Sequence, residues 1–145
     1  MIWIKDGTDT VGDTTCDGWK SLARGDLMSA EETSDELASD CASVLTELVD
    51  VAEGAIVSRV LASSSGGNVT LFAFDRGQGL SEHTAPFDAL VQVVDGRLNL
   101  TIGGAEIAVG PGEIVRMPAG VAHALHAPKP SRMLLTMLRE PNPED

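Results

Sequence analysis

Two histidines, His83 and His123, are the residues whose type and position could most readily do chemistry in this chain. An imidazole can ligate a divalent metal ion, and near neutral pH it can also act as a general base. His83 lies in the stretch GQGLSEHTAPFDALVQVVDG (77–96) and His123 lies in VAHALHA (121–127). No Ser or Cys lies in a recognisable nucleophile motif, so the candidate chemistry is that of imidazole groups.

The segments that carry these histidines are predicted to be short β-strands. From residue 55 onward, β-rich stretches alternate with turns that contain Gly, Pro or Asp, at intervals of about ten residues. The predicted strands lie within 55–63, 69–75, 77–85, 88–96, 97–104, 105–112, 113–120, 121–127 and 131–140. That rhythm is typical of an antiparallel sandwich or barrel. The pairs DG at 95–96 and GG at 103–104 are hairpin signals.

Strand alternation predicts which side chains share a face with His83. Positions 83, 85, 89, 91 and 93 can point to one side, provided that the chain bends at Pro86. A strand returning through 118–127 would bring His123 onto the same inner face. The two histidines are therefore expected to share the barrel interior, where they either hydrogen-bond to each other, to water or to the backbone, or bind a ligand.

Two sets of residues at this spacing resemble the motifs of the cupin family, over residues 55–139. The first motif runs G, five residues, H, one residue, H, three or four residues, E, six residues, G, and it is matched by Gly77, His83 and Gly96. The second runs G, five residues, P, one residue, G, two residues, H, three residues, N, and it is matched by Gly112, Pro118, Gly120 and His123. The resemblance implies an all-β fold, a cupin jelly-roll barrel.

The chain departs from the family pattern at Ala85, Ala89 and Ala127, which replace the second His, the Glu and the final Asn. In metal-binding cupins, three His and one Glu hold an ion such as iron, manganese, zinc or nickel. Catalytic zinc normally has three protein ligands, and redox iron takes two His and a carboxylate. The expected cofactor is therefore none, or a divalent metal bound weakly by His83 and His123.

Three other polar residues could replace the missing ligands. Asp88 and Glu82 each lie one position from a ligand position, and strand alternation points them to the opposite face unless a bulge in TAPFD turns Asp88 inward. His126, three residues after His123, also faces outward on a regular strand. We expect Asp88 to cap a turn and His126 to be a solvated surface residue.

Alanine at positions 85 and 89 removes bulk as well as ligands, which predicts a concave apolar pocket for a small molecule. Its predicted lining is His83, His123, Val91, Val93, Leu125 and Met137. Three classes of function remain open, in order of preference. They are a barrel that binds or senses a small ligand, an enzyme of the isomerase or oxygenase type using His acid–base chemistry or a weak metal, and a structural or regulatory partner.

The charge of the chain limits its partners. Twenty-two acidic and ten basic residues give a net charge of −12, which repels nucleic acids and anionic membranes. The same composition favours either an ordinary acidic protein or one adapted to high salt. No apolar run approaches a membrane span of about 20 residues, and two cysteines without a CxxC pair favour a reducing cytoplasm. Resemblance to small cupins implies a homodimer.

The N-terminal third differs in composition from the barrel. Residues 1–27 are rich in Asp, Gly and Thr and are predicted to be a flexible arm, dispensable for a fold that could begin at Met28. Residues 28–54 are predicted to hold a short amphipathic helix and a lead-in, with Ser29 and Glu32 as a capping box. Its apolar residues are Leu37, Cys41, Val44, Leu45 and Leu48. Val44 to Val51 also supports extended structure. Residues 55–145 are assigned to the barrel.

Overall fold

The computed structural model describes residues 36–140. The chain divides into two compact units, and the described residues of the larger one are 36–37 and 44–140. In this part of the chain there is one 3-10 turn, η1 (Leu45–Glu47), and nine strands. The strands are β1 (Ile56–Ser64), β2 (Gly67–Phe74), β3 (Gly79–His83), β4 (Asp88–Asp95), β5 (Leu98–Ile102), β6 (Ala105–Val109), β7 (Ile114–Met117), β8 (His123–His126) and β9 (Ser131–Leu138).

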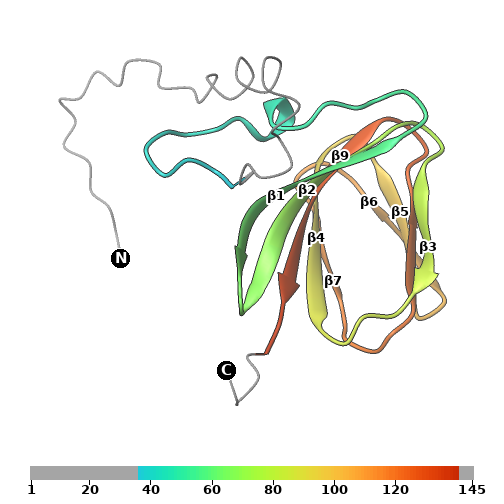
Figure 1. The fold of residues 1–145 in the computed structure, drawn as a ribbon. Helices are drawn as coiled ribbons and strands as arrows, with labels where there is room; N and C mark the ends of the chain where they lie inside the picture. The colour runs from blue at the N-terminus through green and yellow to red at the C-terminus, as the bar shows by residue number, and fades with distance from the viewer. Residues whose placement is uncertain (1–35, 141–145) are drawn as a thin grey trace. The chain divides into compact units, whose positions relative to one another are not determined.

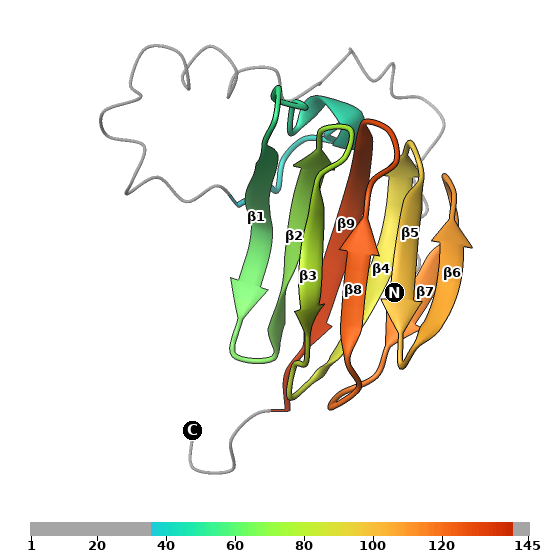
Figure 2. The ribbon, with the colours of Figure 1, turned by 90° about the vertical axis from the view of Figure 1, so that its right-hand side faces the viewer.

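The strands form two antiparallel sheets that face each other (Figure 1). One sheet has the order β1-β2-β9-β4-β7, and the other has the order β3-β8-β5-β6, which is turned toward the viewer in Figure 2. The all-β jelly-roll prediction is confirmed, and each of the nine predicted stretches overlaps one strand. The GG pair at 103–104 does close the β5–β6 hairpin, with φ of +57° and +85°. The DG pair does not, because β4 and β5 belong to different sheets and the turn crosses between them.

The core lies between the sheets because alternate residues of each strand are apolar and point inward. Val91 and Val93 on β4, Leu98 and Leu100 on β5 and Met133 on β9 are all 0% exposed. These side chains belong to a single buried cluster that both sheets contribute to. Burial of such side chains is the main force holding the two sheets together.

A second buried group lies on part of the outer side of the five-stranded sheet. Leu48 and Val49 follow η1 and are 3% and 5% exposed, nearly as buried as Leu71 of β2 at 0%. Arg59 donates from Nη1 to the Leu48 carbonyl at 3.4 Å, and Arg132 donates from Nε to the Val49 carbonyl at 2.9 Å. Arginines on the sheet therefore hold the segment that precedes β1.

The prediction of an amphipathic helix within residues 28–54 is wrong for residues 36–54, the part of this range that the structure describes. Between residues 36 and 54 the only helical structure is the three-residue η1. The Leu48 and Val49 carbonyls bond to arginine side chains of the sheet, and the Leu37 N–H donates to the Leu61 carbonyl of β1 at 2.9 Å. Tertiary hydrogen bonds thus replace helical ones. The predicted arm, residues 1–27, lies outside the described residues.

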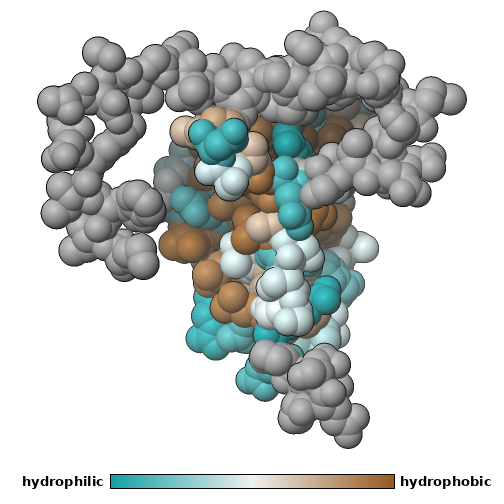
Figure 3. Space-filling view, turned by 60° about the vertical axis from the view of Figure 1, so that its left-hand side comes forward, coloured by the Kyte–Doolittle hydropathy of each residue, from teal (hydrophilic) through white to brown (hydrophobic). Residues whose placement is uncertain are grey.

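Two further features bear on the sequence-based expectations. Cys41 is disulfide-bonded, whereas the sequence pattern predicted reduced cysteines. No helix in the described range is long and apolar enough to cross a membrane. Figure 3 shows apolar side chains gathered on the outer side of the five-stranded sheet, where Leu138 is 49% exposed.

Candidate functional site: a pair of histidines at one end of the barrel

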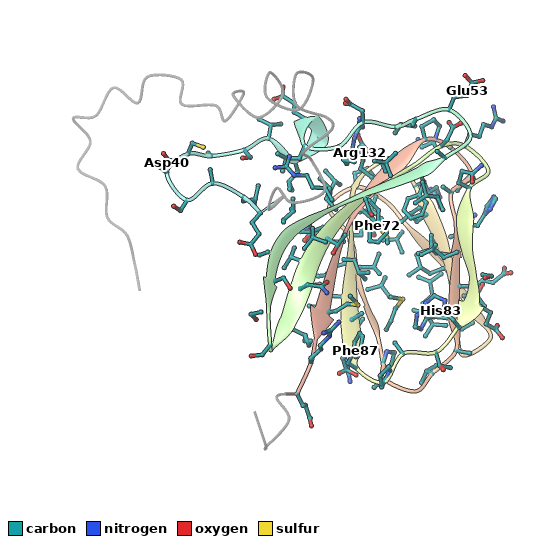
Figure 4. The ribbon with its side chains drawn as sticks, viewed as in Figure 1. Asp40, Glu53, Phe72, His83, Phe87 and Arg132 are labelled. Carbon is teal, nitrogen blue, oxygen red and sulfur yellow. The ribbon has the colours of Figure 1, made fainter. Side chains whose placement is uncertain are left out.

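Four strands begin or end at the same end of the barrel, and they bring the two histidines together. β3 ends at His83, β8 begins at His123, β4 begins at Asp88 and β7 ends at Met117. His83 and His123 are opposite each other in the β3–β8 register. Figure 4 shows His83 directed from β3 into the space between the sheets, with Phe87 at the same end. The fold therefore brings His83 and His123 together, as the strand alternation predicted.

The two imidazole rings are in direct contact. Their Nε2 atoms are 3.1 Å apart, and the rings meet edge to face with their centroids 4.3 Å apart. His123 is only 6% exposed, whereas His83 is exposed. The pair therefore has one buried member and one member that a ligand can reach from outside.

The second nitrogen of each ring is held by a backbone carbonyl. His83 Nδ1 lies 2.7 Å from the Ser81 oxygen, and His123 Nδ1 lies 3.1 Å from the Val121 oxygen. A carbonyl oxygen can only accept, so each Nδ1 carries the hydrogen and each Nε2 presents its lone pair. Two neutral rings in these tautomers would set two lone pairs against each other. The contact is favourable when a proton, a hydrogen of a ligand or a cation lies between them.

The positions of the missing cupin ligands lie at the same end of the barrel as this pair. Ala89, next to the first residue of β4, is 5% exposed and lies in register between Met117 of β7 and Met137 of β9. The Ala85 carbonyl accepts a hydrogen bond of 2.8 Å from the Gly120 N–H, which ties the loop after His83 to the loop before His123. Methyl groups thus occupy the places of two polar ligands.

The residues present do not fit a complete metal centre. With metal–nitrogen bonds of about 2.1 Å, two nitrogens 3.1 Å apart would subtend about 95° at the ion, an acceptable angle. The number of ligands is the difficulty, since no group of three or more His, Cys, Asp or Glu in the described part of the chain could hold a metal ion. Two imidazoles are fewer than catalytic zinc or redox iron normally take.

Asp88, the nearest candidate for a third ligand, is engaged elsewhere. Its Oδ1 accepts the Ala119 N–H at 2.8 Å, and its Oδ2 accepts Arg116 Nη2 at 3.0 Å. The Ala119 N–H and then the Arg116 guanidinium lower the pKa of the Asp88 carboxyl below its ordinary value. The expectation that Asp88 caps a turn is confirmed. The alternative, in which a bulge turns it inward, is wrong because these two donors hold the carboxylate. Glu82 and His126 are both exposed.

The predicted apolar lining is distributed between the core and the site. Val91 and Val93 are 0% exposed and Leu125 is 7% exposed, within the buried cluster, and Met137 packs against that cluster. Sequence reasoning missed Met117, which is 5% exposed and opposite Ala89 in register. Its place immediately before Pro118 of the second motif is the signal that could have identified it.

Proteins that are similar to this chain have the same type of fold. Residues 70–138 match the family model described as the cupin domain. A conserved protein of unknown function from Streptococcus pyogenes is 30% identical with a TM-score of 0.69, over 72% of this chain and 92% of that one. A cupin 2 conserved barrel domain protein from Leptotrichia buccalis is 35% identical with a TM-score of 0.63, over 65% of this chain and 46% of that one.

An uncharacterized protein from Streptomyces coelicolor is 39% identical over 59 residues, which is 41% of this chain and 56% of that relative. The fold and the paired histidines define a small β-barrel protein with an incomplete ligand set at one end. The chain belongs to the cupin family.

Proposed function

We propose that this cupin binds a small molecule at the end of the barrel where His83 and His123 meet. The observation that carries the proposal is the contact between the two Nε2 atoms at 3.1 Å while each Nδ1 faces a carbonyl. Two converging lone pairs form an acceptor site for a hydrogen-bond donor. A ligand hydroxyl or other acidic hydrogen fits this site, and His83 is exposed enough to receive it.

The apolar surroundings support the same proposal. Ala89, Met117 and Met137 lie in register beside one another at this end of the barrel, and none of them carries a charge. Small-molecule sites are mostly apolar with a few convergent polar groups that fix orientation. In this arrangement the two imidazoles orient the polar end of the ligand, while Val91, Val93 and Leu125 remain part of the buried core.

An acid–base enzyme is the second candidate. The contact between an exposed and a buried imidazole favours it, because a hydrogen taken from a ligand by His83 Nε2 can be shared with His123 Nε2. Such a pair could move a hydrogen between two positions of one molecule, as in an isomerisation. Turnover of a bound compound, and not binding alone, distinguishes this candidate from the first.

A thermal-shift screen tests the binding proposal. The full chain is mixed with a panel of small hydroxy, keto and enol compounds, and each compound that raises Tm is retested with His83→Gln and His123→Gln. Gln keeps a polar side chain but presents no pair of imidazole lone pairs, so the Tm shift should disappear in both variants. Glu82→Gln is the matched control, since Glu82 is the exposed neighbour of His83.

The outcomes separate the possibilities. A shift that survives in both histidine variants would place the ligand elsewhere and contradict the proposal. A protein that responds to transition metals alone, with no organic compound active, would contradict it as well. Loss of the shift in the histidine variants, with retention in Glu82→Gln, is the result that supports it.

A further inference from the structure

A hollow of about 510 Å³ lies on the outer face of the four-stranded sheet, the face turned to the viewer in Figure 2. It is lined by β5, β6 and β8, whose outward side chains here are short or polar. Leu100 and Leu125, at 0% and 7% exposed, belong to the buried core and point to the other side of the same sheet. The hollow is therefore separated from the histidine pair by the sheet itself.

The strand register arranges the outward side chains as a grid of two rows. In the first row, Asn99 lies between His126 of β8 and Ala108 of β6. In the second row, Thr101 lies between Ala124 of β8 and Glu106 of β6. Polar side chains thus occupy the centre and two opposite corners, and alanines leave the other two corners open.

The four polar side chains of this grid have unused hydrogen-bonding capacity. Within the described residues, the side chains of Asn99, Thr101, Glu106 and His126 form no hydrogen bond or ion pair. An amide, a hydroxyl and an imidazole each offer both a donor and an acceptor, and the carboxylate adds acceptors. These groups lie along the floor of the hollow, on three strands that together span about 10 Å.

We propose that this hollow binds a neutral, polyhydroxylated molecule such as a saccharide. Each hydroxyl of such a ligand both donates and accepts, which matches the mixed donors and acceptors of the four side chains. Anions are disfavoured by Glu106 and by the net charge of −12. Cations are disfavoured because Glu106 is the single carboxylate in the lining of the hollow. Open corners at Ala108 and Ala124 give a ring room to lie against the sheet.

NMR titration of the full chain tests this site. Backbone amide and Asn side-chain shifts are followed while maltose is added, and glucosamine and glucose 6-phosphate serve as cationic and anionic probes. Maltose should produce saturable shifts at Asn99, Thr101, Glu106 and His126 with millimolar affinity. The shifts of His83 and His123 should remain unchanged, which separates this site from the barrel site.

Two variants act on the hollow in different ways. Asn99→Ala removes the central amide, and Ala108→Trp fills an open corner without removing any hydrogen-bonding group. Each should weaken maltose binding at least tenfold, whereas Gln92→Ala, which removes an exposed amide from the other sheet, should leave it unchanged.

Three outcomes would overturn the proposal. The first is no saturable shift with maltose, and the second is equal binding in both hollow variants. The third is tighter binding of the phosphate or the amine than of maltose. A shift pattern on this face that depends on protein concentration and not on sugar would assign the face to a second copy of the chain, and would also overturn it.

Discussion

Restoring the two missing ligands should convert the histidine pair into a tight metal site. The double variant Ala85→His with Ala89→Glu places the two absent family ligands beside His83 and His123. Ala89 is 5% exposed, so the new carboxylate is buried without a partner in the metal-free protein. The effective penalty for burying an unpaired charge is several kcal/mol. With about 4–8 °C of Tm per kcal/mol for a domain of about 100 residues, the metal-free variant should melt at least about 10 °C below wild type.

Added zinc should reverse this loss. A metal present at about 100 times its Kd stabilises the folded state by about 2.7 kcal/mol, which corresponds to about 10–20 °C. The assay is thermal unfolding followed by circular dichroism, with and without zinc, beside elemental analysis. The control exchanges two exposed alanines far from the site, Ala52→His with Ala62→Glu. If wild type gains as much Tm from zinc as the double variant, or if the folded double variant gains none, the placement of positions 85 and 89 at this site is refuted.

Three other predictions concern the loop, the charge and the assembly. Asp88→Asn should lower Tm by a few degrees near neutral pH. Because the pKa of Asp88 is lowered in the folded state, the carboxylate stabilises the fold above the ordinary pKa of 3.8, and this stabilisation should disappear as the pH falls through the lower folded pKa. Equal differences in Tm between variant and wild type at pH 7 and pH 2.5 would contradict this prediction. The net charge of −12 opposes the compact state and is screened over about 10 Å at 0.1 M salt, so Tm should rise as KCl increases from there to molar levels, and a flat response would remove the proposal of salt adaptation. We also propose that the chain forms a homodimer in which the partner covers the apolar outer side of the five-stranded sheet, where Leu138 is 49% exposed. Light scattering at micromolar concentration should give twice the mass of one chain, and the mass of a single chain would contradict this proposal.

The strands could be predicted from sequence because their signals are local. Turn residues such as Gly103 and Gly104 and the alternation of apolar side chains both act within a few residues. The histidine pair could be predicted because two motifs with fixed spacing bring His83 and His123 to paired strands. The cause of the strands lies in short stretches of the chain, whereas the pairing of histidines 40 residues apart was predicted from strand alternation and the resemblance of the two motifs to the cupin pattern.

What escaped prediction depends on contacts between residues distant in sequence. The segment after η1 does not continue as a helix, and Arg59 and Arg132, 11 and 83 residues away, bind its carbonyls. The position of Asp88 is fixed by donors 28 and 31 residues further along. The tautomers of the histidines are set by carbonyls that a pattern of residue types does not reveal. Periodicity has no information about such partners.

Native mass spectrometry of freshly purified full chain, beside elemental analysis, tests the central claim most directly. A barrel that binds a small molecule through His83 and His123, without a complete metal centre, should carry well under one transition-metal ion per chain. It should also show added mass from an organic ligand that is lost in His83→Gln and His123→Gln. A stoichiometric metal ion that survives dialysis against a chelator, with no organic mass, would contradict this account.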